Sequence, residues 1–314
     1  MKALAKIIIS LAISLTICQV FFIILSTGLR KFNIHKTERL TELFLGSTKY
    51  DILFLGSSRT HTNIDPQIID SICHSNSYNA GIEGGNLYEF NMTLNAYLLN
   101  HPSPGYLILT IDLTSFELQK KLYNYVQYLP FVQNKIIEKT LIENRYYNTL
   151  YKILPFLEFT YYDDYTRINC LKGFTNENEI PKGDFQYKGY LSNTNNTILS
   201  EDTTKYFSTI EISPNGIDLL ENIVKTCKSK QIKLIFTYAP EYKKGHQKHT
   251  VNSKEVFDVI KKNARKNNIL FWEHDNLEIC LNPHFFANIG HLNKEGAEIY
   301  SRILGNELNR ILTK

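Results

Sequence analysis

The chain has 314 residues, of which 43% are hydrophobic and 21% charged, an ordinary globular composition that can supply one sizeable core or two small ones. The net charge is only +4 with neutral histidine, and the basic residues are dispersed, which argues against a nucleic-acid partner. The five cysteines form no C-x-x-C pair, so a zinc site is not expected. The four cysteines beyond the N-terminal segment leave two disulfides or none as alternatives.

An uncharged apolar run at the N-terminus is the clearest compositional signal. Residues 7–29 read IIISLAISLTICQVFFIILSTGL, about the length that a hydrocarbon core of roughly 30 Å requires. Most cleaved signal peptides have a shorter apolar region and a small-residue exit, and a helix of a soluble protein would carry a charged face. The run therefore predicts an uncleaved anchor over residues 1–29, with the membrane as a partner through residues 7–29. Basic residues flank both ends, so charge predicts no orientation.

Strands and helices are expected to alternate through the rest of the chain. Helical spacing of apolar residues predicts helices over residues 87–98, 214–227, 253–260 and 300–311, and apolar runs predict strands over residues 51–55, 77–80, 106–111, 232–238 and 269–272. This alternation predicts an α/β domain whose parallel sheet is covered by helices on both faces.

The predicted domain organisation has a connector and an insertion. Residues 30–48 form a charged amphipathic connector in which Leu40, Leu43 and Phe44 share one helical face, and the soluble domain follows over residues 49–314. Residues 116–211 interrupt the alternation. Their first half is rich in Tyr, Leu and Phe and predicts two to four helices, whereas their second half is polar and predicts a loop. An insertion of this length in a compact domain is usually a cap, a lid or a binding loop.

Polar and glycine-rich segments follow the predicted strands. Active sites of open parallel sheets lie beyond the carboxyl ends of the strands, so these segments are where chemistry is expected. The turn GSSR exposes Ser58, and Gly84 with Gly85 can present backbone N–H groups without side-chain obstruction. A nucleophilic serine also needs a base, and His291 lies just before the last predicted helix. The alternatives are that Ser58 is a helix N-cap and that His291 is a partner for nearby backbone.

These segments resemble the sequence blocks of the SGNH (GDSL-type) hydrolases, in the order of that family. Gly56-Ser57-Ser58 resembles the first block, NAGIEG over residues 79–84 the second, and Asn288-x-x-His291 the last. The resemblance implies a three-layer αβα, flavodoxin-like sheet. It also implies that Ser58 is the nucleophile, that His291 is the base, and that the N–H groups of Ser58 and Gly84 bind the oxyanion.

The sequence departs from the family pattern at two positions. The asparagine of the third block is missing; Asp112 and Thr114 are the nearest polar residues, and Asp112 is the predicted replacement at the oxyanion site. Asn288 stands where the family has an acid. An asparagine can hold the imidazole in orientation but cannot stabilise an imidazolium by charge. Glu273, Asp275 and Asp112 are other acids that could take that role.

Arg59 directly follows the predicted nucleophile, and two interpretations of it remain open. It is either a surface residue or an anion-binding group that holds substrate beside Ser58.

The resemblance is closest to membrane-anchored SGNH-like proteins of bacterial envelopes. It implies a single-pass membrane protein with an extracytoplasmic catalytic domain: a serine esterase or O-acyltransferase acting on acyl esters of envelope glycans. The substrate would be an acylated polysaccharide or a small ester, and neither a metal nor another cofactor is implied. One alternative is a non-catalytic glycan-binding or assembly protein on the same fold. Another is a soluble esterase whose N-terminus is a cleaved signal.

Overall fold

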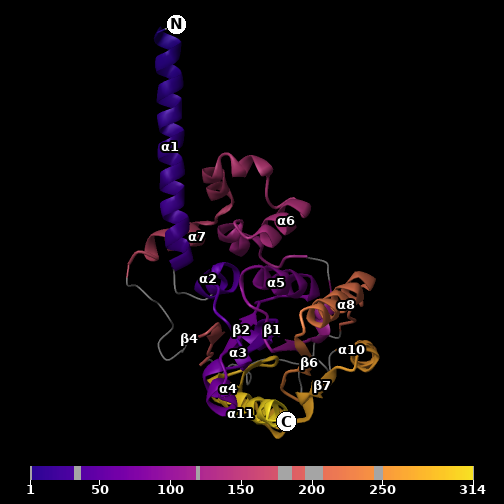
Figure 1. The fold of residues 1–314 in the computed structure, drawn as a ribbon. Helices are drawn as coiled ribbons and strands as arrows, with labels where there is room; N and C mark the ends of the chain where they lie inside the picture. Colours follow the sequence, from indigo (N-terminus) through magenta and orange to yellow (C-terminus); the bar gives the residue numbers. More distant parts are fainter. Residues whose placement is uncertain are drawn as a thin grey trace. The chain divides into compact units, whose positions relative to one another are not determined.

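The chain forms two compact units, each of which is discontinuous in sequence (Figure 1). The computed structural model describes residues 2–31, 37–117, 121–175, 186–194, 208–243 and 250–313. One unit comprises residues 1–45 and 124–179, and the other comprises residues 46–123 and 180–314. Most of the polar segment that was expected to be a loop, from residue 195 to 207, lies outside the described residues.

The second unit is built on a five-stranded parallel sheet with the strand order β2-β1-β3-β6-β7. Numbered along the sheet-forming strands alone, this is the flavodoxin-like order, so the predicted fold class is confirmed. Each observed strand lies within one or two residues of its prediction. The strands are β1 (Ile52–Gly56), β2 (Ser77–Gly81), β3 (Tyr106–Thr110), β6 (Lys233–Tyr238) and β7 (Leu270–Glu273).

Helices cover both faces of this sheet, as Figure 1 shows for α5 and α8 on one face and α4 and α11 on the other. Ile52 and Phe54 belong to the core beneath α4 and α11, and their neighbours Leu53 and Leu55 point to the opposite face because side chains alternate along a strand. The helices are α3 (Ser58–Asn63), α4 (Pro66–Cys73), α5 (Leu87–Asn100), α8 (Pro214–Ser229), α10 (Ser253–Asn267) and α11 (Lys294–Leu312).

Short elements complete this unit. Two antiparallel hairpins pair β4 (Gln186–Tyr187) with β5 (Tyr190–Leu191) and β8 (Phe286–Asn288) with β9 (His291–Leu292). The 3₁₀ helices are η1 (Leu113–Phe116), η6 (His274–Asn276), η7 (Glu278–Leu281) and η8 (Pro283–Phe285).

The first unit combines the N-terminal helices with part of the predicted insertion. Helix α2 (Thr37–Leu45) buries Leu40, Leu43 and Phe44, which confirms the predicted apolar face, and Phe44 packs edge-on against Phe131 with ring centroids 5.5 Å apart. Residues 37–45 and 124–175 therefore lie in one compact unit. The elements of the inserted part are η2 (Tyr125–Phe131), α6 (Lys135–Glu143), η3 (Thr149–Lys152), η4 (Pro155–Tyr161) and α7 (Asp164–Lys172).

Helix α1 (Lys2–Lys31) contains the apolar run, and within the described chain it alone is long and apolar enough to cross a membrane. Large apolar side chains from Leu4 to Ile24 are exposed along it. Its last turns are different: Phe22, Leu25 and Leu29 are buried in the first unit.

All five cysteines are free thiols. Of the two alternatives, two disulfides or none, the structure shows none. Cys73, Cys170, Cys227 and Cys280 are buried, and burial raises the pKa of each thiol, to about 12 for Cys227. Buried thiols with raised pKa values are poor nucleophiles, so these four cysteines are interpreted as packing residues of the core and not as reactive groups.

Gly56 ends β1 where neighbouring backbone and side chains leave no space for a Cβ atom. A Cβ placed there would lie 2.2 Å from Thr60 Oγ1 and 2.9 Å from the Cβ of Thr110. We therefore expect Gly56→Ala to lower the free energy of unfolding by about 1–3 kcal/mol, the usual cost of overpacking. Denaturant unfolding monitored through the fluorescence of Trp272, the single tryptophan, measures this change.

Gly105→Ala is the matched control, because the nearest atom to a Cβ at that position is Asp51 O at 3.4 Å. Its free energy of unfolding should stay within about 0.5 kcal/mol of the wild-type value. Equal effects of the two substitutions would contradict this account of Gly56.

Glu158 is a buried carboxyl group in the first unit and is 2% exposed. It accepts a 3.0 Å hydrogen bond from Tyr147 Oη and lines a cavity of about 320 Å³. Burial raises the pKa of Glu158, whereas the hydrogen bond from Tyr147 and the charge of Arg30 lower it. The effect of burial is the larger one, and the resulting pKa is about 7. Between pH 4.5 and 7 the folded chain therefore keeps a proton that the unfolded chain has released, and stability falls as the pH rises through this range.

We expect Glu158→Gln to remove this pH dependence. At about pH 4 the variant and the wild type should be equally stable. At about pH 8 the variant should be more stable, by up to about 3 kcal/mol, because one pKa unit corresponds to about 1.4 kcal/mol. Unfolding curves at both pH values test this, and a variant that is less stable at the higher pH would show that the ionised carboxylate is needed.

Candidate active site

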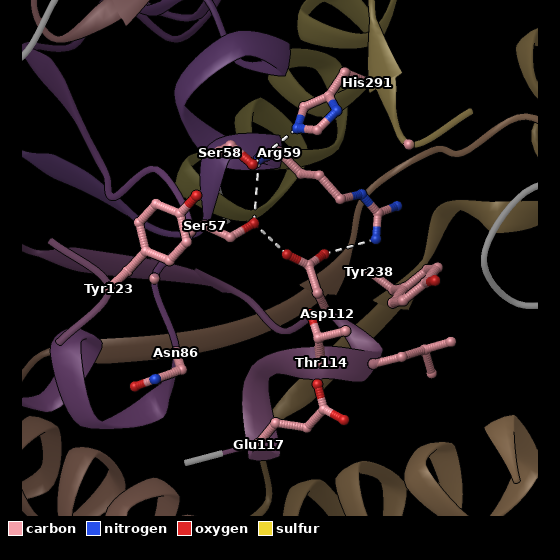
Figure 2. Close-up of a pocket in the computed structure, with 14 residues that line it drawn as sticks. Ser57, Ser58, Arg59, Asn86, Asp112, Thr114, Glu117, Tyr123, Tyr238 and His291 are labelled. Carbon is pink, nitrogen blue, oxygen red and sulfur yellow. Dashed lines mark hydrogen bonds and ion pairs between the residues drawn. The ribbon is translucent and has the colours of Figure 1, made fainter. Parts of the chain in front are cut away.

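Ser58 lies at the sharp turn between β1 and α3. The Ser57 side chain caps α3 by accepting a hydrogen bond from Arg59 N at 3.1 Å, which makes Ser58 the first helical residue. The cap role that was weighed for Ser58 is therefore filled by Ser57. Ser58 Oγ instead lies 2.8 Å from His291 Nε2 (Figure 2).

The β8–β9 hairpin holds His291 by an interaction with Asn288. Asn288 Oδ1 accepts hydrogen bonds from the backbone N–H groups of Gly290 and His291, both at 3.0 Å, and lies 2.9 Å from His291 Nδ1. The two backbone donors fix the amide orientation, because only the oxygen can accept from them. His291 Nδ1 must then carry the proton, and in a neutral ring Nε2 is left as the acceptor for the Ser58 hydroxyl.

The acids that were weighed as substitutes for Asn288 are engaged elsewhere. Glu273 pairs with Lys261 at 2.8 Å, Asp275 accepts a hydrogen bond from Asn276 at 3.1 Å, and Asp112 binds Arg59. The orienting partner of the imidazole is therefore Asn288, an uncharged group.

Asn63, at the end of α3, fixes the histidine hairpin to the helix that carries the serine. Its Oδ1 accepts a hydrogen bond from Leu292 N at 3.1 Å, and the residue is fully buried. Asn63 was not among the predicted site residues, because nothing in a short polar segment shows which residue will meet a hairpin more than 200 positions away.

Two backbone N–H groups beside Ser58 have no acceptor among the described residues: those of Ser58 and Gly84. Gly84 has φ = +67°, in the left-handed region that favours glycine, and a Cβ there would lie 2.5 Å from the Tyr123 ring. The next amide, Gly85 N, is already bonded to Ile82 O at 2.9 Å. Unpaired N–H groups lining the cavity beside a serine are what an oxyanion site requires.

Asp112 has a different place from the one predicted for it. Its carboxylate accepts hydrogen bonds from Ser57 Oγ and from Arg59, whose Nη1 lies 2.6 Å from Oδ1, and its backbone N–H donates to Ser115 Oγ at 2.9 Å. A carboxylate is only an acceptor and its amide is used, so Asp112 offers no donor to an oxyanion. The predicted contribution of Asp112 to oxyanion binding is not supported.

Arg59 is buried, which excludes the surface interpretation. Its guanidinium bonds Asp112 and Ala239 O and lies over the Tyr238 ring, with Cζ 4.5 Å from the centroid (Figure 2). Burial alone would lower the pKa of Arg59, but the Asp112 carboxylate, with Tyr238 and Glu241, raises it. Arg59 thus binds the protein's own carboxylate, which leaves direct binding of a substrate anion without structural support.

A cavity of about 360 Å³ opens above Ser58 and His291. Its walls include three residues that were not predicted, Asn86, Glu117 and Tyr123, and also Thr114. Burial raises the pKa of the Glu117 carboxyl. Within the described ranges, no cluster of three His, Cys, Asp or Glu residues could hold a metal ion.

Several solved structures are similar to this one. They include a protein described as a lipolytic protein of the G-D-S-L family from Desulfitobacterium hafniense, with 13% identity, coverage of 83% of this chain and 98% of that chain, and a TM-score of 0.42. An acylhydrolase from Bacteroides fragilis has 13% identity, 89% and 99% coverage and a TM-score of 0.45. A catalytic mutant of an acetylxylan esterase from Geobacillus stearothermophilus has 11% identity, 83% and 95% coverage and a TM-score of 0.42.

No protein-family model matches the chain, and no curated protein matches it. Likenesses with identities of 11–13% and TM-scores below 0.5 assign no activity, so the function has to be judged from the geometry of the site.

The Asn288 position offers a direct test of the site. An aspartate there could accept the same three donors and would add the charge that stabilises an imidazolium. We expect Asn288→Asp to raise the rate of covalent labelling by a fluorophosphonate about 10- to 1,000-fold, less than the roughly 10⁴-fold loss that the reverse change causes in serine proteases. Asn288→Ala is the matched control and should lower the rate, because it removes the orienting oxygen. Equal labelling rates for the two variants would show that Asn288 does not orient the base.

Proposed function

We propose that this protein is an SGNH-type serine esterase or O-acyltransferase that acts on acyl esters of envelope glycans. The proposal rests on the continuous hydrogen-bonded chain from Ser58 Oγ through His291 to Asn288 Oδ1, at the carboxyl end of a flavodoxin-like sheet. Beside it lie two backbone N–H groups that have no acceptor in the part of the chain that the structure describes. The order of the sequence blocks supports the same assignment.

The proposed reaction is an acyl transfer in two steps. Ser58 Oγ attacks the ester carbonyl carbon while His291 Nε2 takes the hydroxyl proton, and the N–H groups of Ser58 and Gly84 bind the oxyanion. The C–O bond to the leaving alcohol breaks as His291 returns the proton to that oxygen, which leaves an acyl-serine. Water or a glycan hydroxyl then loses its proton to His291 and takes the acyl group, which restores Ser58.

With Asn288 in place of an acid, we expect the same reaction at a lower rate. Replacement of an orienting acid by an amide is most damaging where it forces the wrong histidine tautomer. Here Asn288 Oδ1 is held as an acceptor by two backbone donors, so the productive tautomer is kept and only the charge is missing.

The same missing charge favours the second candidate function, a non-catalytic glycan-binding or assembly protein. In that case the cavity over Ser58 would hold an acylated glycan without cleaving it. The two candidates differ in one observable, formation of a covalent bond at Ser58.

We further propose that α1 anchors the chain in the membrane with the catalytic unit on the extracytoplasmic side. The burial of Phe22, Leu25 and Leu29 supports an uncleaved helix, because removal of α1 would take these side chains out of the core of the first unit. This argues against the alternative of a soluble esterase released from a signal peptide.

Substitution of the two neighbouring serines tests the proposed function. Ser58→Ala should abolish both fluorophosphonate labelling and hydrolysis of p-nitrophenyl acetate, with a nearly unchanged melting temperature. Ser57→Ala should retain labelling. Loss of the helix cap should lower the free energy of unfolding by about 0.5–2 kcal/mol, and loss of the hydrogen bond to Asp112 should lower it further.

Mass spectrometry of the labelled peptide locates the modified residue. Labelling that persists in Ser58→Ala would assign the chemistry to another residue. A wild-type chain that is neither labelled nor turns over ester would decide for the glycan-binding protein.

A further inference from the structure

Exposed apolar side chains gather on the first unit outside α1. They lie on or directly after two of its short helices, η3 and α7, and their exposed fractions reach 75% at Ile153 and 60% at Leu171. We call this set the apolar collar: Leu150, Ile153, Ile168, Leu171 and Phe174. Single exposed apolar residues are normal, but several on neighbouring parts of one small unit mark an interaction surface.

Helix α7 exposes two large apolar side chains. Ile168 and Leu171, three positions apart and hence on one face, are exposed, whereas Asn169 and Cys170 are buried. The buried side packs tightly on α1: a Cβ at Gly28 would lie 2.0 Å from Cys170 O. The exposed side of α7 also carries the ion pair of Asp164 and Arg167, 3.0 Å apart, so it presents two large apolar side chains beside charged ones. Large apolar side chains of a helix on a soluble protein usually face the core, so the exposure of Ile168 and Leu171 is unusual for a helix surrounded by water.

The collar lies beside the end of the apolar run of α1. Helix α7 meets α1 at Gly28, one residue before the run ends, and basic residues follow at Arg30 and Lys31. Lys31 Nζ lies 5.8 Å from the centroid of the Phe174 ring. Aromatic and basic side chains together are typical of the boundary between acyl chains and headgroups, where the ring is buried and the ammonium reaches the phosphates.

The hairpin of η3 and η4 contributes the other part of the collar. Leu150 lies within η3, and Ile153 directly follows η3. One residue, Leu154, separates Ile153 from η4, which packs on α1 in the same unit. Lys152 lies between these two apolar residues and pairs with Glu138 at 2.8 Å, so its charge is not buried in the collar.

We propose that the apolar collar inserts into the headgroup–acyl boundary of a phospholipid bilayer, so that the first unit lies in the membrane surface instead of hanging from α1. The occupant is lipid because α7 and η4, which carry or adjoin the collar, pack on the apolar helix α1, and because Phe174 of the collar lies beside the basic Lys31 that follows the apolar run. This inference rests on the proposed membrane anchoring by α1. It adds a second contact that holds the unit against the bilayer.

Site-specific tryptophan fluorescence tests the collar in the full chain. Trp272→Phe first removes the single tryptophan, and a new one is then placed at Ile153 or Leu171 of the collar. Ile9→Trp in α1 serves as the membrane-buried reference, and Leu281→Trp, at a position 58% exposed in the second unit, serves as the water-exposed reference. Each variant is reconstituted in phosphatidylcholine–phosphatidylglycerol vesicles with or without brominated acyl chains, and circular dichroism checks the fold.

We expect bromolipid quenching and blue-shifted emission for Ile153→Trp and Leu171→Trp, intermediate between the strong quenching at Ile9→Trp and the absence of quenching at Leu281→Trp. Quenching at Ile9→Trp alone would overturn the collar while leaving the anchor intact. No quenching at Ile9→Trp would overturn the anchor and the collar together. Equal quenching at Leu281→Trp would also overturn the collar, because lipid contact would then not be specific to it.

Discussion

The buried ion pair of Arg59 and Asp112 is the constraint on which the site depends. Arg59 starts from the turn after β1, Asp112 follows β3, and Ala239 O, which Arg59 also bonds, follows β6. One guanidinium thus ties together the carboxyl ends of three neighbouring strands. Breaking a buried ion pair by removing one partner costs several kcal/mol because the other charge is left unpaired, so these strand ends are held in a single arrangement.

The same pair determines what the two adjacent serines can do. The Ser57 hydroxyl donates a hydrogen bond to the Asp112 carboxylate and accepts one from Arg59 N, which caps α3. Both interactions stabilise the fold, so the Ser57 side chain is not directed at a substrate. Ser58 is turned the other way, where His291 is its side-chain partner at 2.8 Å. Two chemically identical groups therefore receive different roles from one buried carboxylate, and Asp112 itself is part of the scaffold.

The sequence was sufficient for the sheet and for the central contact of the site. Continuous apolar runs depend on local burial, and the carboxyl ends of parallel strands meet at one edge, so the segments with Ser58 and Gly84 could be placed together from the sequence. The place of His291 came instead from the resemblance of residues 288–291 to a family block. Asp112 and Arg59 could not be assigned in this way. Their roles depend on which of several polar groups within reach pair with one another, and that is decided by side-chain directions.

The packing partner of α2 was less predictable for a related reason. The apolar face of residues 40–44 was evident, but its partner lies near residue 131, and nothing local identifies so distant a contact. The unpaired N–H groups of Ser58 and Gly84 are likewise a property of the folded backbone. Neighbouring amides donate hydrogen bonds within the helix cap and the turn, whereas these two have no acceptor among the described residues.

The discontinuity of the first unit constrains the order in which the chain can be assembled. Helices α1 and α2 are synthesised first, but the helices that cover them, between residues 124 and 175, emerge only after β1, β2 and β3 of the other unit. During this interval Phe22, Leu25 and Leu29 have no protein partner from the described inserted helices. Lipid can shield these side chains in the meantime, whereas a chain of the same sequence made in water would expose them and invite aggregation. Under the proposed anchoring, early delivery of α1 to a bilayer would serve folding of the first unit as well as localisation.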